Sequence, residues 1–211
     1  MKKLLIKFIH FSLFIIYSTV AIAQDNYIDS LKRILQTEKE DTQKVYTIAN
    51  ISIRLSIKKD SVAAFQYATN ALQLAQKLNF TRGEAYACFS LSFFYGNTRK
   101  PDSALKYAFK ALSLYEEIND KANTAFICQI VGDYYDNGLN NEPEALVYLY
   151  KALKLYEQLG DKKSIAYCLY QIGAKNYWLE NYDESLKNYQ QCLQLSKEII
   201  TPKVLLNLIS T

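Results

Sequence analysis

Histidine is almost missing from this 211-residue sequence, and its single copy, His10, lies in an apolar segment near the N-terminus. The rest of the chain therefore has no imidazole to serve as general base, metal ligand or phosphoacceptor. This excludes a Ser-His-Asp or Cys-His nucleophile and an H-E-x-x-H metal site. No other nucleophile and base are clustered, so we expect no enzyme activity, no catalytic residue, no metal and no cofactor.

Cysteine pairs at metal-binding spacing are also absent. The four cysteines are Cys88, Cys128, Cys168 and Cys192, and no two of them form a C-x-x-C motif. An exported protein can form disulfides, but neighbouring helices usually hold their Cα atoms more than roughly 7 Å apart. We therefore interpret the cysteines as small buried apolar residues.

Proline and glycine are scarce, with three and six copies, and no stretch alternates apolar and polar residues as a half-buried strand does. The three prolines, Pro101, Pro143 and Pro202, fall where a helix is expected to begin. Gly96, Gly138 and Gly160 fall where helices are expected to end or turn. This pattern predicts an all-α protein.

The N-terminus combines a basic start, an apolar run over residues 8–16 and a small-residue end at Ala21-Ile22-Ala23. We interpret residues 1–23 as a secretory signal peptide, with an uncleaved membrane anchor as the alternative. Removing them lowers the 25 basic residues to 22, against 21 acidic residues, and leaves no basic stripe. The N-terminal pattern therefore predicts an exported protein. The nearly neutral charge of the remaining residues predicts that it does not bind nucleic acid.

A repeat of about forty residues organises the remainder. A pair of small residues, seven apart, recurs in four blocks: Ala64 and Ala71, Ala104 and Ala111, Ala145 and Ala152, Ser185 and Cys192. A second small position recurs upstream, at Ser52, Ser92, Gly132 and Gly173. The spacings agree if one residue is inserted in the third block, in the turn over residues 138–141.

Each block carries apolar residues at three-and-four spacing, which is typical of two amphipathic helices. The small pair lies on one face of the second helix and allows close helix packing. We predict a right-handed superhelical solenoid of antiparallel helix pairs, with repeats at 41–80, 81–120, 121–161 and 162–200. Residues 26–40 are predicted to form an N-terminal capping helix, and residues 201–211 the start of a fifth repeat or a capping helix.

The run QIGAKNYWLENYDESLKNYQQCLQL resembles the tetratricopeptide repeat, with Gly173 at the small position of the first helix and Tyr182 and Tyr189 at aromatic positions. Ser185 and Cys192 stand where that repeat usually has alanine. The resemblance covers residues 41–200 and implies the fold and a protein or peptide partner, but it does not identify that partner.

A signal peptide followed by forty-residue repeats resembles the extracytoplasmic front of bacterial sensor histidine kinases. The resemblance implies an exported, periplasmic or extracytoplasmic interaction region of a membrane-bound signal-transduction protein whose output domain is not in this sequence. Attachment to a membrane is then expected only through a missing downstream segment or an uncleaved signal peptide. The alternative is a self-standing periplasmic scaffold for envelope or secretion assemblies.

The first helices of such a solenoid are expected to line its concave side. Positions three before, one after and four after the small residue are predicted to face this groove. The residues selected are Phe89, Phe93, Gln129, Asp133, Asp136, Tyr170 and Tyr177. Their aromatic, amide and acidic groups would suit an extended peptide with an apolar and a basic element, although some could simply pack on adjacent helices. Asp133 and Asp136 have no neighbouring base, which favours a solvated helix face for this pair.

Overall fold

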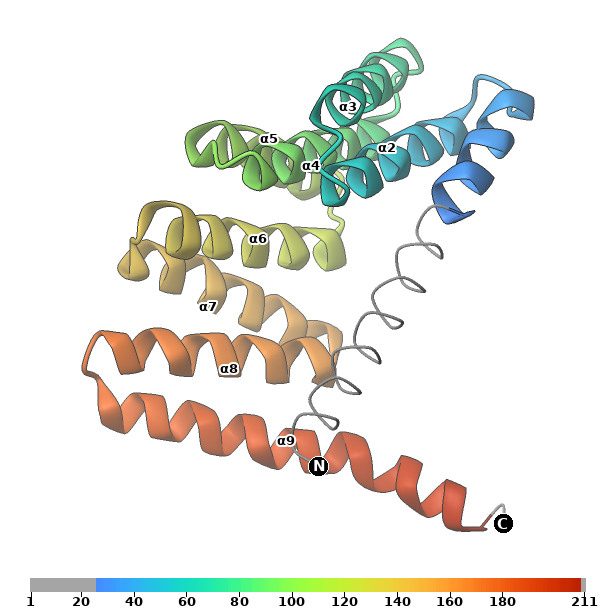
Figure 1. Ribbon diagram of the computed structural model, residues 1–211. Coiled ribbons are helices and arrows are strands. Elements are labelled where there is room, and N and C mark those ends of the chain that lie inside the picture. The colour runs from blue at the N-terminus through green and yellow to red at the C-terminus, as the bar shows by residue number, and fades with distance from the viewer. Residues whose placement is uncertain (1–25, 210–211) are drawn as a thin grey trace, which may run out of the picture.

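A computed structural model describes residues 26–209 of the chain (Figure 1). The predicted signal peptide lies outside the described residues. Residues 26–37 form a helix, and the helices that follow are α2 (Thr42–Ile57), α3 (Ser61–Lys77), α4 (Thr81–Asn97), α5 (Pro101–Glu117), α6 (Lys121–Leu139), α7 (Glu142–Leu159), α8 (Lys162–Trp178) and α9 (Tyr182–Ile209). The described part contains no strand, and the all-α prediction is confirmed.

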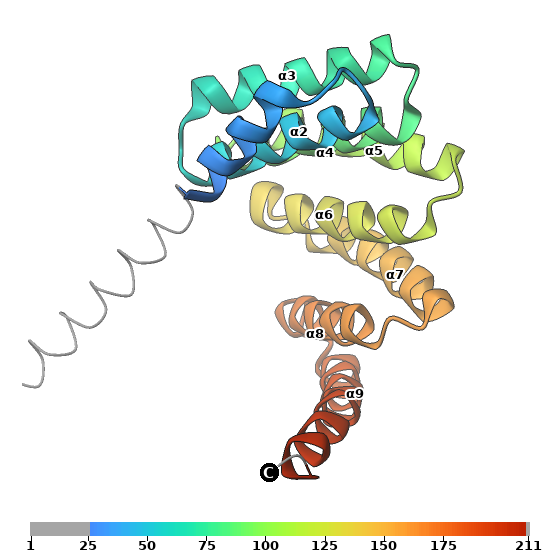
Figure 2. The ribbon, with the colours of Figure 1, turned by 90° about the vertical axis from the view of Figure 1, so that its right-hand side faces the viewer.

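The helices form four antiparallel pairs, α2/α3, α4/α5, α6/α7 and α8/α9, which stack into a curved solenoid (Figures 1 and 2). Each second helix also packs on the first helix of the next pair. One apolar cluster runs through the middle of the stack, from Ala85 in α4 to Ile172 in α8. The core is therefore continuous from α4 to α8, as expected for stacked repeats that cannot bury their apolar faces alone, and the buried residues of α2 and α3 belong to two further clusters.

The predicted small residues lie where the two helices of a pair touch. Ala64, Ala104 and Ala145 are fully buried, and the Ser52 hydroxyl donates to the Ala64 carbonyl at 2.7 Å. A Cβ added to Gly132 would come within 3.2 Å of the Ala145 carbonyl oxygen. Small side chains are required here because the backbones of the two helices approach so closely.

One turn conformation is used throughout the stack. A left-handed residue occurs at Lys59, Asn79, Arg99, Asn119, Asn140, Gly160 and Glu180, with φ between 50° and 66°. At each site two backbone bonds close the preceding helix, as where Asn79 N–H donates to Gln76 and Phe80 N–H donates to Ala75. At six of the seven sites this is the Schellman ending, whereas at Asn140 each bond reaches one residue further back. The residue after the left-handed one is already the N-cap of the next helix, as Phe80 is for α4. The compact turn fixes the spacing of the repeats.

The extra residue of the third block is accommodated where α6 ends, between Tyr135 and Asn141, which overlaps the predicted turn over residues 138–141. Asn140, the left-handed residue, follows the small Gly132 by eight residues, whereas Lys59 follows Ser52 and Arg99 follows Ser92 by seven. The two closing bonds there each span one residue more than elsewhere, because Asn140 N–H donates to Asp136 and Asn141 N–H donates to Tyr135. Helix α6 is accordingly 19 residues long, against 17 for α4 and α8.

The helix over residues 26–37 covers the N-terminal end of the stack. Its Ile28 is buried against Ile51 and Leu55 of α2, and the Arg54 guanidinium lies 5.0 Å from the centre of the Tyr27 ring. Figures 1 and 2 show this helix beside α2. The part of α2 that holds Ile51 and Leu55 is therefore covered.

The other end of the stack differs from the prediction. Residues 201–209 were expected to open a new helix at Pro202, but α9 continues without a break from Tyr182 to Ile209, for 28 residues. In Figure 1 it projects past the helix on which it packs. Over residues 26–209, no helix is both long and apolar enough to cross a membrane.

Candidate interaction surface

The residues predicted to line a groove do not share one surface. Phe89 is buried where α4 faces α6, with its ring 5.2 Å from the ring of Phe126. Phe93 is half-buried, 6.2 Å from the Phe89 ring, and Gln129 is half-buried on α6. These positions point toward the first helix of the next repeat, so at least Phe89 acts in packing between repeats.

Asp133 and Asp136 have the same kind of environment, which corrects the interpretation of a solvated face. The Asp133 carboxylate accepts from Gln171 Nε2 of α8 at 3.1 Å, and Asp136 forms an ion pair with Lys175 of the same helix. The side chains of Asp136 and Lys175 are both largely buried. Two polar contacts thus join α6 to α8.

The electrostatics of this junction are unusual because a carboxyl group is buried with only partial compensation. Burial raises the pKa of Asp133 from 3.8 to about 6, and the neighbouring Asp136 charge acts in the same direction. The Gln171 hydrogen bond and the Lys175 charge oppose this rise. A carboxyl group with such a pKa can titrate near neutral pH. Its hydrogen-bond partner here, Gln171, joins it to α8, so Asp133 contributes to packing between repeats.

Tyr170 and Tyr177 are exposed, because no helix within the described residues follows α8 and α9 in the stack. Together with neighbouring side chains they form what we call the terminal face. It consists of Tyr167, Tyr170 and Tyr177 of α8 and Tyr182, Leu186 and Leu193 of α9, with Trp178 at its edge. Tyr189 lies between the two rows.

Comparison with earlier repeats shows what is unusual about the terminal face. Leu193 is 57 % exposed, whereas its equivalents Leu112 and Leu153 are 6 % and 9 % exposed under α6 and α8. Tyr170 is 54 % exposed, whereas its equivalent Phe89 is 8 % exposed. The same positions that bury apolar side chains inside the stack present them to solvent at its end.

Ring contacts make the terminal face continuous across the two helices. The Tyr170 and Tyr189 rings lie 5.9 Å apart, and the Tyr177 ring lies 5.7 Å from Tyr182 and 5.8 Å from Trp178. The two Tyr177 contacts are edge-to-face, an arrangement that aromatic pairs favour, and the Tyr170–Tyr189 pair is tilted. A contiguous exposed aromatic patch is typical of a protein-binding surface.

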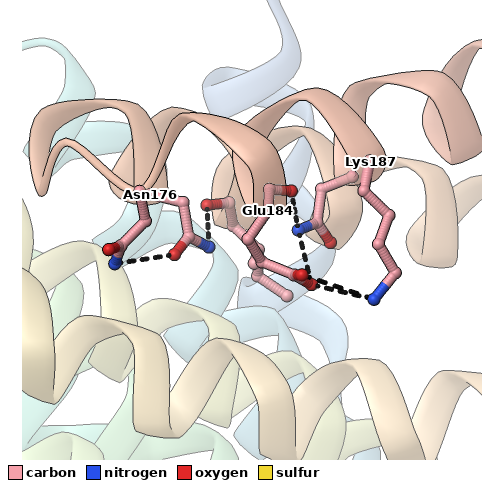
Figure 3. Close-up of polar contacts among 6 residues, drawn as sticks. Asn176, Glu184 and Lys187 are labelled. Carbon is pink, nitrogen blue, oxygen red and sulfur yellow. Dashed lines mark hydrogen bonds and ion pairs between the residues drawn. The ribbon is translucent and has the colours of Figure 1, made fainter.

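A buried polar network fixes the turn that carries these aromatic residues (Figure 3). Asn181 Nδ2 donates to the Asn176 side-chain oxygen at 3.4 Å, and Asn176 Nδ2 donates to the Ile172 carbonyl at 3.0 Å. On α9, Asn188 Nδ2 donates to the Glu184 carbonyl at 2.6 Å. Asn176 and Asn188 are both buried. The bonds of Asn176 orient the α8/α9 turn, whereas Asn188 bonds to Glu184 one turn earlier in α9.

The chemistry available elsewhere is limited. Across residues 26–209, no group of three or more histidine, cysteine, aspartate or glutamate side chains could hold a metal ion. Cys88, Cys128 and Cys168 are buried, and burial raises the pKa of each thiol, to about 12, 11 and 12. A thiol that stays protonated at neutral pH is a poor nucleophile.

Solved structures resemble the stack closely in shape but not in sequence. The chain matches BtubC from P. vanneervenii with a TM-score of 0.71 and 16 % identity, over 84 % of this chain and 72 % of that one. It matches a Rap protein in complex with competence and sporulation factor with a TM-score of 0.73 and 16 % identity, over 87 % and 52 %.

A third match names the repeat. A signal transduction ATPase with a tetratricopeptide repeat sensor, from Pyrococcus horikoshii, gives a TM-score of 0.68 and 20 % identity, over 85 % of this chain and 28 % of that one. The fold is a tetratricopeptide-type solenoid. No protein-family model matches the sequence, and no curated protein matches it. The chain thus corresponds to about half of the Rap protein and to a smaller part of the ATPase.

Sequence reasoning identified Tyr170 and Tyr177 but missed the rest of the terminal face. Trp178 could have been found from the sequence. Its equivalents at the ends of earlier first helices are Ile57, Asn97 and Asn137, so a tryptophan replaces a residue that is polar in two of three repeats. Leu186 and Leu193 gave no such signal in the sequence, because a helix that is covered by the next repeat also carries leucine at those positions. Whether any of the seven selected residues binds a partner stays a prediction.

Proposed function

We propose that this chain is the exported protein-interaction region of a membrane-bound signal-transduction protein, and that it binds a protein partner through the terminal face. The observation that carries the proposal is the terminal face itself: aromatic and leucine side chains are exposed there at positions such as 170 and 193, where earlier repeats bury their equivalents under a helix. Enrichment in tyrosine and tryptophan is characteristic of residues that dominate binding energy.

Other features support the wider role. The first 23 residues have the composition of a secretory signal, and the fold is one that the Rap protein and the Pyrococcus ATPase also use. The Rap protein is complexed with a competence and sporulation factor, and the ATPase carries its repeats as a sensor. A solenoid that senses by binding, coupled to an output domain elsewhere, accounts for a chain with no recognisable catalytic group.

Site-specific photocrosslinking in the organism that encodes the chain tests the binding surface. A benzophenone amino acid replaces Tyr170 in one variant and Tyr150, which is exposed on α7, in a matched control. We expect a discrete protein adduct from position 170 and none from position 150. Equal adducts from both positions, or none from either, would remove the terminal face as the binding surface.

Export is tested separately by fusing alkaline phosphatase, which is active only outside the cytoplasm, after residue 211. We expect activity that disappears when residues 1–23 are deleted, because those residues carry the basic start and apolar run of a signal. Equal activity without them would contradict the assignment.

A further inference from the structure

We infer that the occupant of the terminal face is a second copy of this chain, paired through the same face about a twofold axis. This inference rests on the proposed binding role of the terminal face and names the partner. It follows from three features of the described residues: where apolar surface is exposed, how the side chains of α9 are spaced, and how the opposite end of the stack is covered.

The terminal face holds the densest group of exposed apolar side chains in the described structure. The other exposed large apolar residues lie singly or in smaller groups on the remaining helices, such as Val62 and Phe65 on α3 and Val147 and Tyr150 on α7. Some exposed apolar side chains are normal on a protein surface. Within residues 26–209, a second copy therefore offers its largest group of exposed apolar side chains through its own terminal face.

The spacing along α9 suits pairing with an identical helix. Tyr182, Leu186, Tyr189 and Leu193 are separated by four, three and four residues, the spacing by which two helices interlock their side chains. Their neighbours Ser185 and Asn188 are buried in the other direction, against the rest of the stack. Helix α9 thus has one row for its own solenoid and an adjacent row for another helix.

The area available is compatible with a stable pair. Six large side chains that are each about half exposed present on the order of 600 Å² per copy, given the roughly 150–250 Å² that an aromatic side chain can bury. Two copies would then bury about 1,200 Å², the lower end of the range for specific interfaces. Trp178 and the surrounding backbone add to this area.

The opposite end directs the assembly toward a closed dimer. Ile28 of the N-terminal helix is buried against Ile51 and Leu55 of α2, so this side of the first repeat is covered and offers less apolar surface for a head-to-tail contact. Within residues 26–209 the terminal face is then the larger apolar surface for self-association, and a face that pairs with itself closes after two copies.

Analytical ultracentrifugation of the purified full chain tests the pairing. We expect the mass to rise with concentration from the monomer value of 24.3 kDa to twice that value. The double variant Leu186→Glu, Leu193→Glu should remain monomeric, because it places four like charges in the paired face. The matched control Val147→Glu, Tyr150→Glu changes two residues of α7 that are 59 % and 43 % exposed, and it should still dimerise.

The single tryptophan supplies an independent readout, since Trp178 is 71 % exposed at the edge of the terminal face. Its emission should move to shorter wavelength as the dimer forms, and circular dichroism checks that each variant is folded. A chain that stays monomeric at all concentrations, or a dimer that survives both glutamates, overturns the inference. A monomeric chain whose position 170 crosslinks to a different protein overturns the pairing but leaves the proposed function standing.

Discussion

Single side chains in this solenoid act mainly by joining one repeat to the next, and Asp133 is the most consequential of them. Its carboxylate meets Gln171 across the gap between α6 and α8. Because burial raises its pKa to about 6, the folded state holds a proton there that the unfolded chain, with a pKa near 3.8, has already lost. Asp133 therefore destabilises the fold whenever it is charged.

The direction of the pH effect follows from that difference. Between about pH 4 and pH 6 the folded state binds more protons than the unfolded state, so stability falls as pH rises, and the loss is complete above pH 6. Asp133→Asn keeps the acceptor for Gln171 and removes the charge. We predict that it raises the free energy of unfolding at pH 7 by about 1–3 kcal/mol.

Urea denaturation at pH 4.5 and pH 7 measures this effect. The Asp133→Asn variant should gain stability at pH 7 and little at pH 4.5, whereas Asp29→Asn, at an exposed position in the N-terminal helix, should change neither. An equal gain at both pH values would show that packing, and not charge, limits this site.

At the scale of helices and turns, seven helix endings that each use a left-handed residue set the geometry of the stack. Six of the seven left-handed residues are not glycine, and each non-glycine side chain there is strained because its Cβ crowds the following carbonyl oxygen. Asparagine tolerates this conformation better than lysine, arginine or glutamate. The turns are thus held by the stack at some local cost.

Substitutions at these turns should have opposite and predictable effects. Lys59→Gly is expected to stabilise the fold by about 0.5 kcal/mol, since relief of strain exceeds the extra entropy of glycine in the unfolded chain. Asn79→Gly should change less. Gly160→Ala should destabilise by about 1 kcal/mol, because φ is +66° even though no atom lies within 4 Å of the added Cβ. Thermal unfolding of the three variants measures this order, and equal shifts would contradict it.

The same elements show what local sequence can determine. The repeat was predictable because small residues such as Ala104 and Gly132 leave a signal wherever two helices touch. The face of each first helix was harder to assign, since Asp133 looks solvated until α8 is placed against it. Pro202 is compatible with the first turn of a helix and, with loss of one hydrogen bond, with a helix interior, so the continuity of α9 could not be predicted.

On the scale of the whole molecule, the solenoid has one covered end and one open end. Each repeat is stabilised mainly by its two neighbours, so a repeat with a single neighbour should open more readily. The first repeat has the helix over residues 26–37 as its second neighbour, whereas within residues 26–209 the pair α8/α9 has only α6 and α7. Stability should therefore decline toward α9.

Hydrogen exchange at two protein concentrations tests this gradient together with the pairing of terminal faces. In dilute solution, amides of α4–α6 should exchange slowest, because they lie within the continuous apolar cluster, and amides of α9 fastest. Raising the concentration should slow exchange in α8 and α9 while leaving α2–α5 unchanged, since only the terminal face gains a neighbour. Uniform exchange along the stack would show that it opens as a single unit, and slowing confined to α2 would place self-association at the covered end instead.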